Sequence, residues 1–235
     1  EIASVNMVYG AAQTGVRSMT SSSSCGISLK SEGISFCASA RIPIVYCNVA
    51  RGGPGIGAIQ PAQQDYFQAT KASGNGGFRM IVLAPATVQG AVDMTYEAFD
   101  LAQRDRNPVL ILADGVLGTI MEPVELPPMR TEEEVRELRE AAKDWALSGH
   151  PAEEKKLTLP GGWRGQEERC KANAAMYETW EKDIRAEEYL LEDAEMVIAA
   201  YGISARVAKS AVRLLRKEGY RVGMIRPQTV SPFPY

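Results

Sequence analysis

The stretch that decides the fold is residues 42–57, which read IPIVYCNVARGGPGIG. Its first eight residues are mostly apolar, and a short run of this kind is typical of a strand buried on both faces of a sheet. A loop that carries Arg51 and four glycines follows the strand at once. Because open parallel sheets bind their ligands beyond the carboxyl ends of the strands, this loop is a candidate binding site.

Helices and strands alternate on both sides of this stretch. We expect helices over residues 1–14, 27–40, 63–70 and 88–104, and further strands over residues 17–20, 80–83 and 109–113. This alternation predicts right-handed βαβ units, and hence an α/β fold whose parallel sheet is covered on both faces. A second α/β unit follows, with strands over residues 194–201 and 221–225 around a helix at 205–217 that Ser204 is expected to cap.

The segment between the two units has a different composition. After Pro127 and Pro128 comes a charged helix at residues 131–143, in which Thr131 and Glu134 have the spacing of a capping box. A second charged helix is expected at residues 167–188, so the segment is interpreted as a connector with little core of its own. Two strands are too few to close the core of the second unit, so we expect the chain to be cut short at its C-terminus. Its true start is also expected to be missing, because residue 1 is Glu rather than Met.

The composition excludes several classes of protein. Of the 235 residues 23% are charged, and the formal net charge of −3 argues against a nucleic-acid-binding surface. No apolar run reaches the roughly 18 residues of a membrane span. The four cysteines, at positions 25, 37, 47 and 170, form no Cys-x-x-Cys pair, so we expect reduced thiols in the cytoplasm and no metal or iron–sulfur ligation by this chain. The single histidine, His150, is expected in a solvated loop rather than in a Ser-His-Asp triad.

Three polar segments are expected at the ligand-binding edge of the sheet: residues 21–26 (SSSSCG), the loop at 51–57, and Asp114 with its following glycine. The glycine spacing fits neither a dinucleotide fingerprint nor a P-loop. The glycines either supply positive φ angles or let a ligand approach the backbone while Arg51 offers its guanidinium to a carboxylate. Alternatively, Arg51 only ties the loop down through Asp65 or Asp114. The serines form either a mobile loop or a set of hydroxyls that bind a ring or a carbonyl group, and Asp114 is more often a turn residue than an acid catalyst.

Several ordered strings resemble the α subunit of the 2-oxoacid:ferredoxin oxidoreductases. They are residues 1–12 (EIASVNMVYGAA), 19–24 (MTSSSS), 26–30 (GISLK), 48–55 (NVARGGPG), 64–71 (QDYFQATK), 82–85 (VLAP) and 114–118 (DGVLG). Residues 200–202 (AYG), 204–206 (SAR) and 225–227 (IRP) resemble the transketolase-C-like domain of the same subunit. The resemblance covers nearly the whole chain and is strongest to the type that acts on 3-methyl-2-oxobutanoate (2-ketoisovalerate). The chain departs from it at Cys25, where the family often has Pro, and at residues 72–77 (ASGNGG), where the family often has Gly-Gly-Gly-His-Gly-Asp.

The resemblance implies a domain division and a set of site residues. Residues 1–126 would be the pyrimidine-binding domain for thiamine diphosphate, residues 127–192 a helical connector, and residues 193–235 the start of the transketolase-C-like domain. Glu1 would be the catalytic glutamate that contacts the pyrimidine ring, and Ser23 and Ser24 would also bind the cofactor. Arg51, as a catalytic and substrate-binding residue, and Gly52 would bind the 2-oxoacid.

The implied activity is oxidative decarboxylation of a 2-oxoacid, expected to be branched-chain, to acyl-CoA and CO₂ with electrons passed to ferredoxin. The chain would be active only with partners: a β subunit that binds the diphosphate and Mg²⁺, and γ and ferredoxin-like δ subunits with 4Fe-4S clusters. Two alternatives stay open. The substrate is 2-oxoglutarate or another 2-oxoacid, for which Lys71 and Arg79 could hold a second carboxylate, or the chain is a non-catalytic α/β binding subunit, as the altered loop at residues 72–77 suggests.

Overall fold

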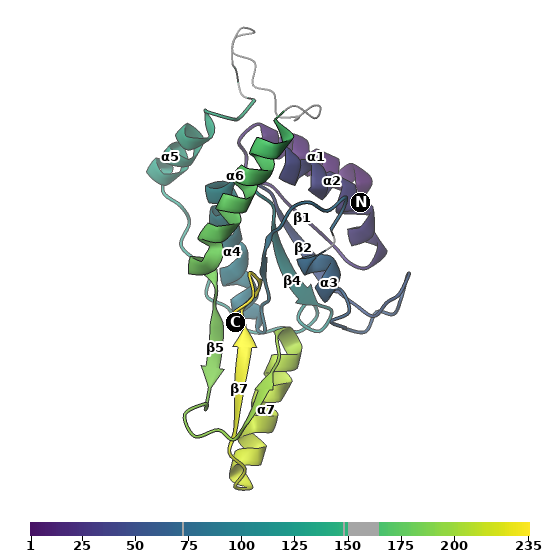
Figure 1. Ribbon diagram of the computed structural model, residues 1–235, viewed down its shortest axis with the longest axis vertical. Coiled ribbons are helices and arrows are strands. Elements are labelled where there is room, and N and C mark those ends of the chain that lie inside the picture. Colours follow the sequence, from purple (N-terminus) through teal and green to yellow (C-terminus); the bar gives the residue numbers. More distant parts are fainter. Residues whose placement is uncertain (72, 148, 150–164) are drawn as a thin grey trace.

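The computed structural model describes residues 1–71, 73–147, 149 and 165–235, and these form two sheets (Figure 1). His150 and Ala72 lie outside the described residues. The larger sheet has the strand order β1-β2-β4-β3-β8, and the smaller one has the order β5-β7-β6. The α/β architecture with a parallel sheet that the sequence predicts is confirmed.

Parallel pairing defines the larger sheet. Its strands are β1 (Met19–Ser22), β2 (Val45–Ala50), β3 (Ile81–Leu83), β4 (Val109–Asp114) and β8 (Thr229–Ser231). The first four run parallel, whereas β8 pairs antiparallel to β3 at one edge. In the register, Ser22 lies beside Asn48, and Ala50 lies beside Asp114. The carboxyl ends of β1, β2 and β4 therefore meet at one edge of the sheet.

Helices cover both faces of this sheet (Figure 1). The helices α1 (Ile2–Gln13), α2 (Cys25–Ser39) and α3 (Tyr66–Thr70) lie on one face, and α4 (Val88–Asp105) and α6 (Gln166–Glu178) lie on the other. Neighbouring residues of a strand point to opposite faces, so Tyr46 packs with α1 and α2 while Val45 packs with α4. Each face thus has its own apolar core.

The connector contributes more to the core than its composition predicts. Trp180 is buried in the α4 core, and its Nε1 donates a hydrogen bond of 2.8 Å to Asp105 Oδ2. The charged helix expected at residues 167–188 ends at Glu178, which corrects that prediction, and a 3₁₀ turn (Thr179–Asp183) follows. Burial of the indole ring requires the chain to turn toward α4, and this tertiary contact overrides the local helix preference. The helix expected at residues 131–143 is α5 (Glu132–Ala142), and its capping box at Thr131 is confirmed.

The smaller sheet takes one strand from the connector. It consists of β5 (Ala186–Tyr189), β6 (Met196–Ala199) and β7 (Val222–Pro227), with α7 (Gly202–Lys217) packed against it. Two predictions need correction here. The second unit has three strands rather than two, because β5 pairs antiparallel with β7, and α7 begins at Gly202 without a side-chain cap. The Ser204 hydroxyl instead donates a hydrogen bond of 3.1 Å to Gln63 Oε1.

The chain enters and leaves the smaller sheet at one point. Arg185, just before β5, donates its backbone amide to Thr229 Oγ1 over 2.9 Å. The amide of Gln228 donates in turn to the carbonyl of Arg185 over 2.9 Å. Thr229 is completely buried and begins β8, which returns the chain to the larger sheet. The division into domains at residues 126 and 192 stays a prediction.

The described helices also bear on the membrane question. None of them combines the length and the apolar character that a bilayer crossing requires.

The contact between α1 and α2 gives a test of the packing. A Cβ atom at Gly33 would lie 2.5 Å from Cγ1 of the buried Val5, whereas a Cβ atom at Gly10 would meet nothing within 4 Å. We predict that Gly33→Ala lowers the free energy of unfolding by about 1–3 kcal/mol through overpacking. The matched control Gly10→Ala should be neutral or should stabilise by up to about 1 kcal/mol, because alanine favours the helix. Urea unfolding of both variants checks this, and equal stabilisation by both substitutions would contradict it.

Candidate functional site

The candidate site is the edge of the larger sheet where β1, β2 and β4 end. Three loops meet there, as the strand ends predict. Ser24 Oγ donates a hydrogen bond of 2.9 Å to the carbonyl of Gly55, which joins the first loop to the second. The amide of Gly115 donates to the carbonyl of Ala50 over 3.1 Å, which joins the third loop to β2. The loops therefore form one connected surface.

The carboxylate of Glu1 is held by two other elements at this edge. Glu1 stands at the N-cap position of α1, and Ser22 at the end of β1 donates a hydrogen bond of 3.0 Å to Glu1 Oε1. A Cβ atom at Gly26 would lie only 2.1 Å from Ser22 Oγ and 2.7 Å from Glu1 Oε1. The first turn of α2 can approach the carboxylate this closely only because residue 26 is glycine. Glu1 is exposed, so it presents an oriented carboxylate to the surface.

The serine run is part of a bonded loop rather than a free one. Ser22 supports Glu1, and Ser24 bonds to Gly55 from a backbone with a φ of 50°. The carbonyl of Ser23 accepts the amide of Gly26 over 3.0 Å. Sequence reasoning named Ser23 and Ser24 and missed Ser22, which is the serine that contacts Glu1. The strand period of two could have pointed to it, because residues 20 and 22 share one face of β1.

The loop at residues 51–57 uses its glycines in two ways. Gly55 and Gly57 have φ angles of 66° and 61°, so both need the conformational freedom of glycine. A Cβ atom at Gly57 would also lie 1.5 Å from the carbonyl oxygen of Gly52, where the loop folds back on itself. The amide of Gly52 donates to the carbonyl of Gln60 over 2.9 Å. The loop is thus a closed turn that fixes the position of Arg51.

Arg51 lies at this edge with an unpaired donor. Its Nε is buried and has no hydrogen-bond partner among the described residues. The carboxylate of Asp65 accepts a hydrogen bond of 2.8 Å from Asn48, and Asp114 Oδ1 accepts from the amide of Val116 over 2.9 Å. The structure therefore gives no support to the reading in which Arg51 ties the loop to either aspartate.

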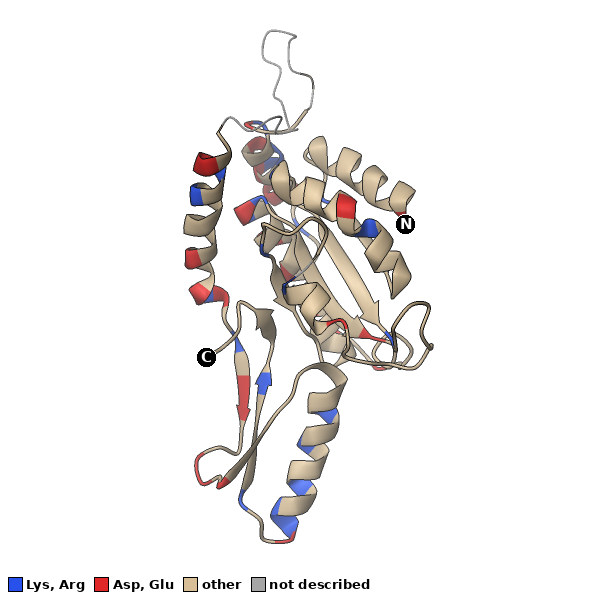
Figure 2. Cartoon of the chain, turned by 45° about the vertical axis from the view of Figure 1, so that its right-hand side comes forward, with Lys and Arg blue, Asp and Glu red and all other residues tan. Residues whose placement is uncertain are grey.

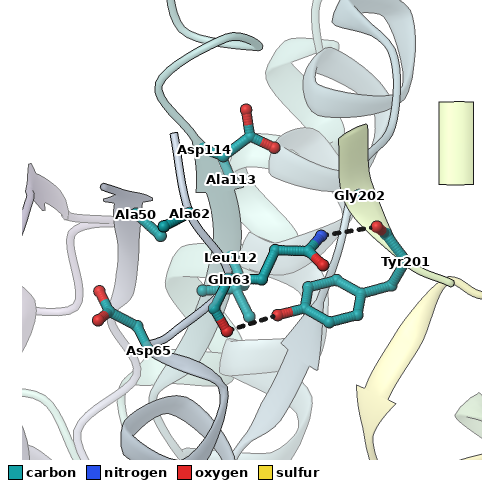
Figure 3. Close-up of a pocket in the computed structure, with 9 residues that line it drawn as sticks. All are labelled: Ala50, Ala62, Gln63, Asp65, Leu112, Ala113, Asp114, Tyr201 and Gly202. Atoms are coloured by element: carbon teal, nitrogen blue, oxygen red, sulfur yellow. Dashed lines mark hydrogen bonds between the residues drawn. The ribbon is translucent and has the colours of Figure 1, made fainter. Parts of the chain in front are cut away.

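Asp114 is a loop and helix anchor, as expected of a turn residue. It lines a small pocket between the sheet edge and α7 (Figure 3), and its Oδ2 accepts from the amide of Ile203 at the start of that helix over 3.4 Å. Across this pocket, Gln63 Nε2 donates to the carbonyl of Tyr201 over 2.7 Å, and the Tyr201 hydroxyl donates to the carbonyl of Gln63 over 3.4 Å. Burial raises the pKa of Tyr201 to about 12, so its phenol is neutral at physiological pH. The pocket is a junction that clamps α7 to the sheet.

The cysteines behave as packing residues or as isolated thiols. Burial raises the pKa of Cys37 to about 12 and that of Cys47 to about 11, so both remain protonated at neutral pH. Cys25 and Cys170 are exposed and unbridged. Within the residues that the structure describes, no cluster of His, Cys, Asp and Glu side chains could hold a metal ion.

Similar proteins are found over the whole chain. It is 47% identical to the ketoisovalerate oxidoreductase subunit VorB of Methanothermobacter marburgensis and 48% identical to that of Methanothermobacter thermautotrophicus, and it spans 66% of the length of each. It is 33% identical to the 2-oxoglutarate synthase subunit KorA of Archaeoglobus fulgidus, of which it spans 67%. In each case the whole of this chain is matched.

A solved structure and two family models complete the comparison. The structure of 2-oxoglutarate:ferredoxin oxidoreductase from Magnetococcus marinus superposes with a TM-score of 0.77 at 24% identity, over 99% of this chain and 45% of that one, which supports the fold. The family model described as pyruvate flavodoxin/ferredoxin oxidoreductase, thiamine diP-bdg, matches residues 1–189, and that described as pyruvate:ferredoxin oxidoreductase core domain II matches residues 194–235. The resemblance seen in the sequence is thereby confirmed, and the chain belongs to the pyruvate flavodoxin/ferredoxin oxidoreductase family.

Proposed function

We propose that the chain is part of the α-type subunit of a 2-oxoacid:ferredoxin oxidoreductase that depends on thiamine diphosphate. The enzyme would oxidatively decarboxylate a branched-chain 2-oxoacid to acyl-CoA and CO₂ and pass the electrons to ferredoxin. The observation that carries the proposal is the Glu1 carboxylate, which Ser22 binds and for which Gly26 leaves room at the carboxyl edge of a parallel sheet. The preference for a branched-chain substrate rests on 47–48% identity to two ketoisovalerate oxidoreductase subunits, against 33% to a 2-oxoglutarate synthase subunit.

The residues present at this edge suit the pyrimidine half of the cofactor. When bound, thiamine diphosphate supplies the carbanion chemistry that removes CO₂ from a 2-oxoacid. Glu1 is exposed, and its carboxylate is held by Ser22. It can therefore exchange a proton with a nitrogen of the pyrimidine ring, which requires a carboxyl group. Ser23 is a proposed contact of the cofactor. The hydroxyl of Ser24 already bonds to Gly55, so its proposed contribution is to hold the loop in place.

Arg51 is the proposed carboxylate binder for the 2-oxoacid. Its guanidinium fork can grip a carboxylate with two parallel hydrogen bonds, and its Nε lacks a partner among the described residues. Gly52 beside it adds no side chain, and even a Cβ atom there would have no neighbour closer than 3.7 Å. This space beside Arg51 would admit the substrate.

The proposed partners are a β subunit that binds the diphosphate and Mg²⁺, and γ and ferredoxin-like δ subunits with 4Fe-4S clusters. The face of α1 and α2 supports contact with another subunit. Residues 2–16 carry no charge, as the plain colour of α1 in Figure 2 shows, and Ile2, Met7, Leu29 and Phe36 are exposed on these helices. An exposed apolar face beside Glu1 is typical of a subunit interface. The complex would work in the cytoplasm with coenzyme A and ferredoxin.

The alternative substrates are less well supported by the geometry. Arg79, which could hold the second carboxylate of 2-oxoglutarate, has its guanidinium 5.7 Å from the ring centre of Tyr177 on α6. Its side chain is thus engaged on the α6 side of the sheet. Turnover of the whole complex with a panel of 2-oxoacids, coenzyme A and a viologen acceptor separates these substrates, and no turnover with any of them would favour the non-catalytic subunit.

We predict that Glu1→Gln, made in the full-length subunit, slows hydrogen exchange at C2 of bound thiamine diphosphate by roughly 10²–10⁴-fold. Glutamine can bond to the ring nitrogen but cannot pass a proton to it. Exchange followed by NMR in the assembled complex measures the effect, with the exposed Glu32→Gln as the control that should exchange normally. Exchange within a few-fold of the wild-type rate would remove Glu1 from the mechanism.

We predict that Arg51→Ala lowers kcat/KM for the 2-oxoacid by about ten- to a hundredfold, since a charge-assisted contact contributes about 1.5–3 kcal/mol. Saturation by coenzyme A and by the cofactor should stay nearly unchanged, and Arg51→Lys should recover only part of the loss. Steady-state kinetics and thermal melts of the complex give the measurement, with the exposed Arg136→Ala as a matched control. Loss of stability and of cofactor binding without a selective change in 2-oxoacid kinetics would show that Arg51 only supports the loop.

A further inference from the structure

Lys30 on α2 is a buried lysine with no described carboxylate at ion-pair distance. Its side chain is 1% exposed. Its Nζ donates to Ser4 Oγ over 2.6 Å and to Thr20 Oγ1, and these two hydroxyls lie 2.9 Å apart. Among the described residues it takes part in no ion pair. Its partners are therefore neutral hydroxyls, which is unusual for a buried ammonium group.

The residue spacing on α1, α2 and β1 relates the position of Lys30 to that of Glu1. Ser4 lies three residues after Glu1 on α1, and Lys30 lies four residues after Gly26 on α2, so each pair shares a helix face. On β1, residues 20 and 22 share a strand face. One layer therefore contains Glu1, Ser22 and Gly26, and the next contains Ser4, Thr20 and Lys30. Lys30 occupies the layer directly beneath the carboxylate.

Such a lysine lowers stability unless something compensates its charge. An ammonium group removed from water loses its hydration, and hydroxyl partners replace that only in part. Burial accordingly lowers the pKa of Lys30, while the negative charge of Glu1 acts in the opposite direction and raises it. Residues 2–13 of α1 and all of β1 contain no charged side chain, and Tyr9 on α1 interacts with Cys37. Glu1 is thus the charge to which Lys30 responds.

We propose that Lys30 is a positioning residue for Glu1: Ser4 and Thr20 hold its ammonium beneath the carboxylate, where its charge orients and stabilises that carboxylate. The inference rests on the proposed role of Glu1 toward the pyrimidine ring. A methionine of similar length would fill the same space without the cost of a buried charge. The lysine therefore contributes an electrostatic effect at the site at the expense of folding stability.

The first experiment measures C2 hydrogen exchange of bound thiamine diphosphate against pH in the assembled, full-length complex. Loss of a nearby positive charge favours the protonated form of a carboxylate. Lys30→Met should therefore shift the acid limb of the profile to higher pH by roughly one pH unit. Thr20→Val removes one of the two hydroxyls that hold the ammonium but keeps the charge, and should move the limb less than Lys30→Met does. Lys217→Met, at the end of α7, serves as the control for an exposed lysine. An unchanged acid limb in folded Lys30→Met overturns the inference.

The second experiment uses no cofactor. Thermal melts of the cofactor-free complex with Glu1→Gln, Lys30→Met and the double variant form a double-mutant cycle. The loss of melting temperature caused by Glu1→Gln should be smaller in the Lys30→Met background, and additive effects overturn the inference. Because the pKa of Lys30 is lowered in the folded protein, the wild type should gain stability relative to Lys30→Met as the pH rises from that lowered pKa toward about 10.4.

Two outcomes separate this inference from the proposed function. If Lys30→Met does not fold, Lys30→Gln keeps donors for both hydroxyls without the charge, and the same shift of the acid limb is expected. If Glu1→Gln abolishes exchange while the charge-removing variants of Lys30 keep the wild-type profile, only the role of Lys30 is overturned. If Glu1→Gln exchanges normally, the proposed function of Glu1 is lost and the role of Lys30 with it.

Discussion

The parallel register of β1, β2 and β4 is the constraint on which the site depends. Met19 lies beside Val45, which in turn lies beside Val109, so the three strands end at the same edge. A slip of one residue would turn every side chain of β1 to the opposite face of the sheet. Ser22 would then point away from Glu1, and the contact that orients the carboxylate would be lost. The position of one hydrogen bond at the surface is thus decided by apolar strands in the core.

Charges are distributed very unevenly in this chain. Away from the site, several arginines are paired with acids: Arg104 on α4 pairs with Asp183 of the connector, and Arg206 on α7 pairs with Glu122 in the segment after β4. Between positions 2 and 29 the single charged residue is Arg17, which precedes β1 and pairs with Asp100. The buried charge of Lys30 therefore acts among uncharged side chains, where electrostatic interactions are stronger than in water. These ion pairs join separate elements of the fold, whereas Arg51 forms no ion pair with a described residue and its Nε has no hydrogen-bond partner there.

Local patterns predicted most of the fold and only part of the site. Apolar periodicity and capping signals depend on a few neighbouring residues, so the helix expected at 88–104 is found at Val88–Asp105. They failed at residues 179–188, where the burial of Trp180 and the pairing of β5 with β7 outweigh local preference. The positions of the strand ends in the sequence were enough to predict that three loops meet at one edge of the larger sheet. The layer of Lys30 beneath Glu1 was not predictable, because a lysine in a helix pattern is expected at the surface and its burial depends on three segments together.

The bonds between Arg185 and Thr229 have a mechanical consequence. The chain leaves for the smaller sheet and returns from it at this one buried crossing, so residues 186–227 form a loop closed at its base by hydrogen bonds. The clamp between Gln63 and Tyr201 attaches the same loop to the larger sheet at a second place. The amide of Ile203 donates to Asp114 and Arg206 pairs with Glu122, so α7 is attached to the larger sheet by more than this clamp. A displacement of α7 would therefore be transmitted to Gln63, in the segment that follows the loop of Arg51.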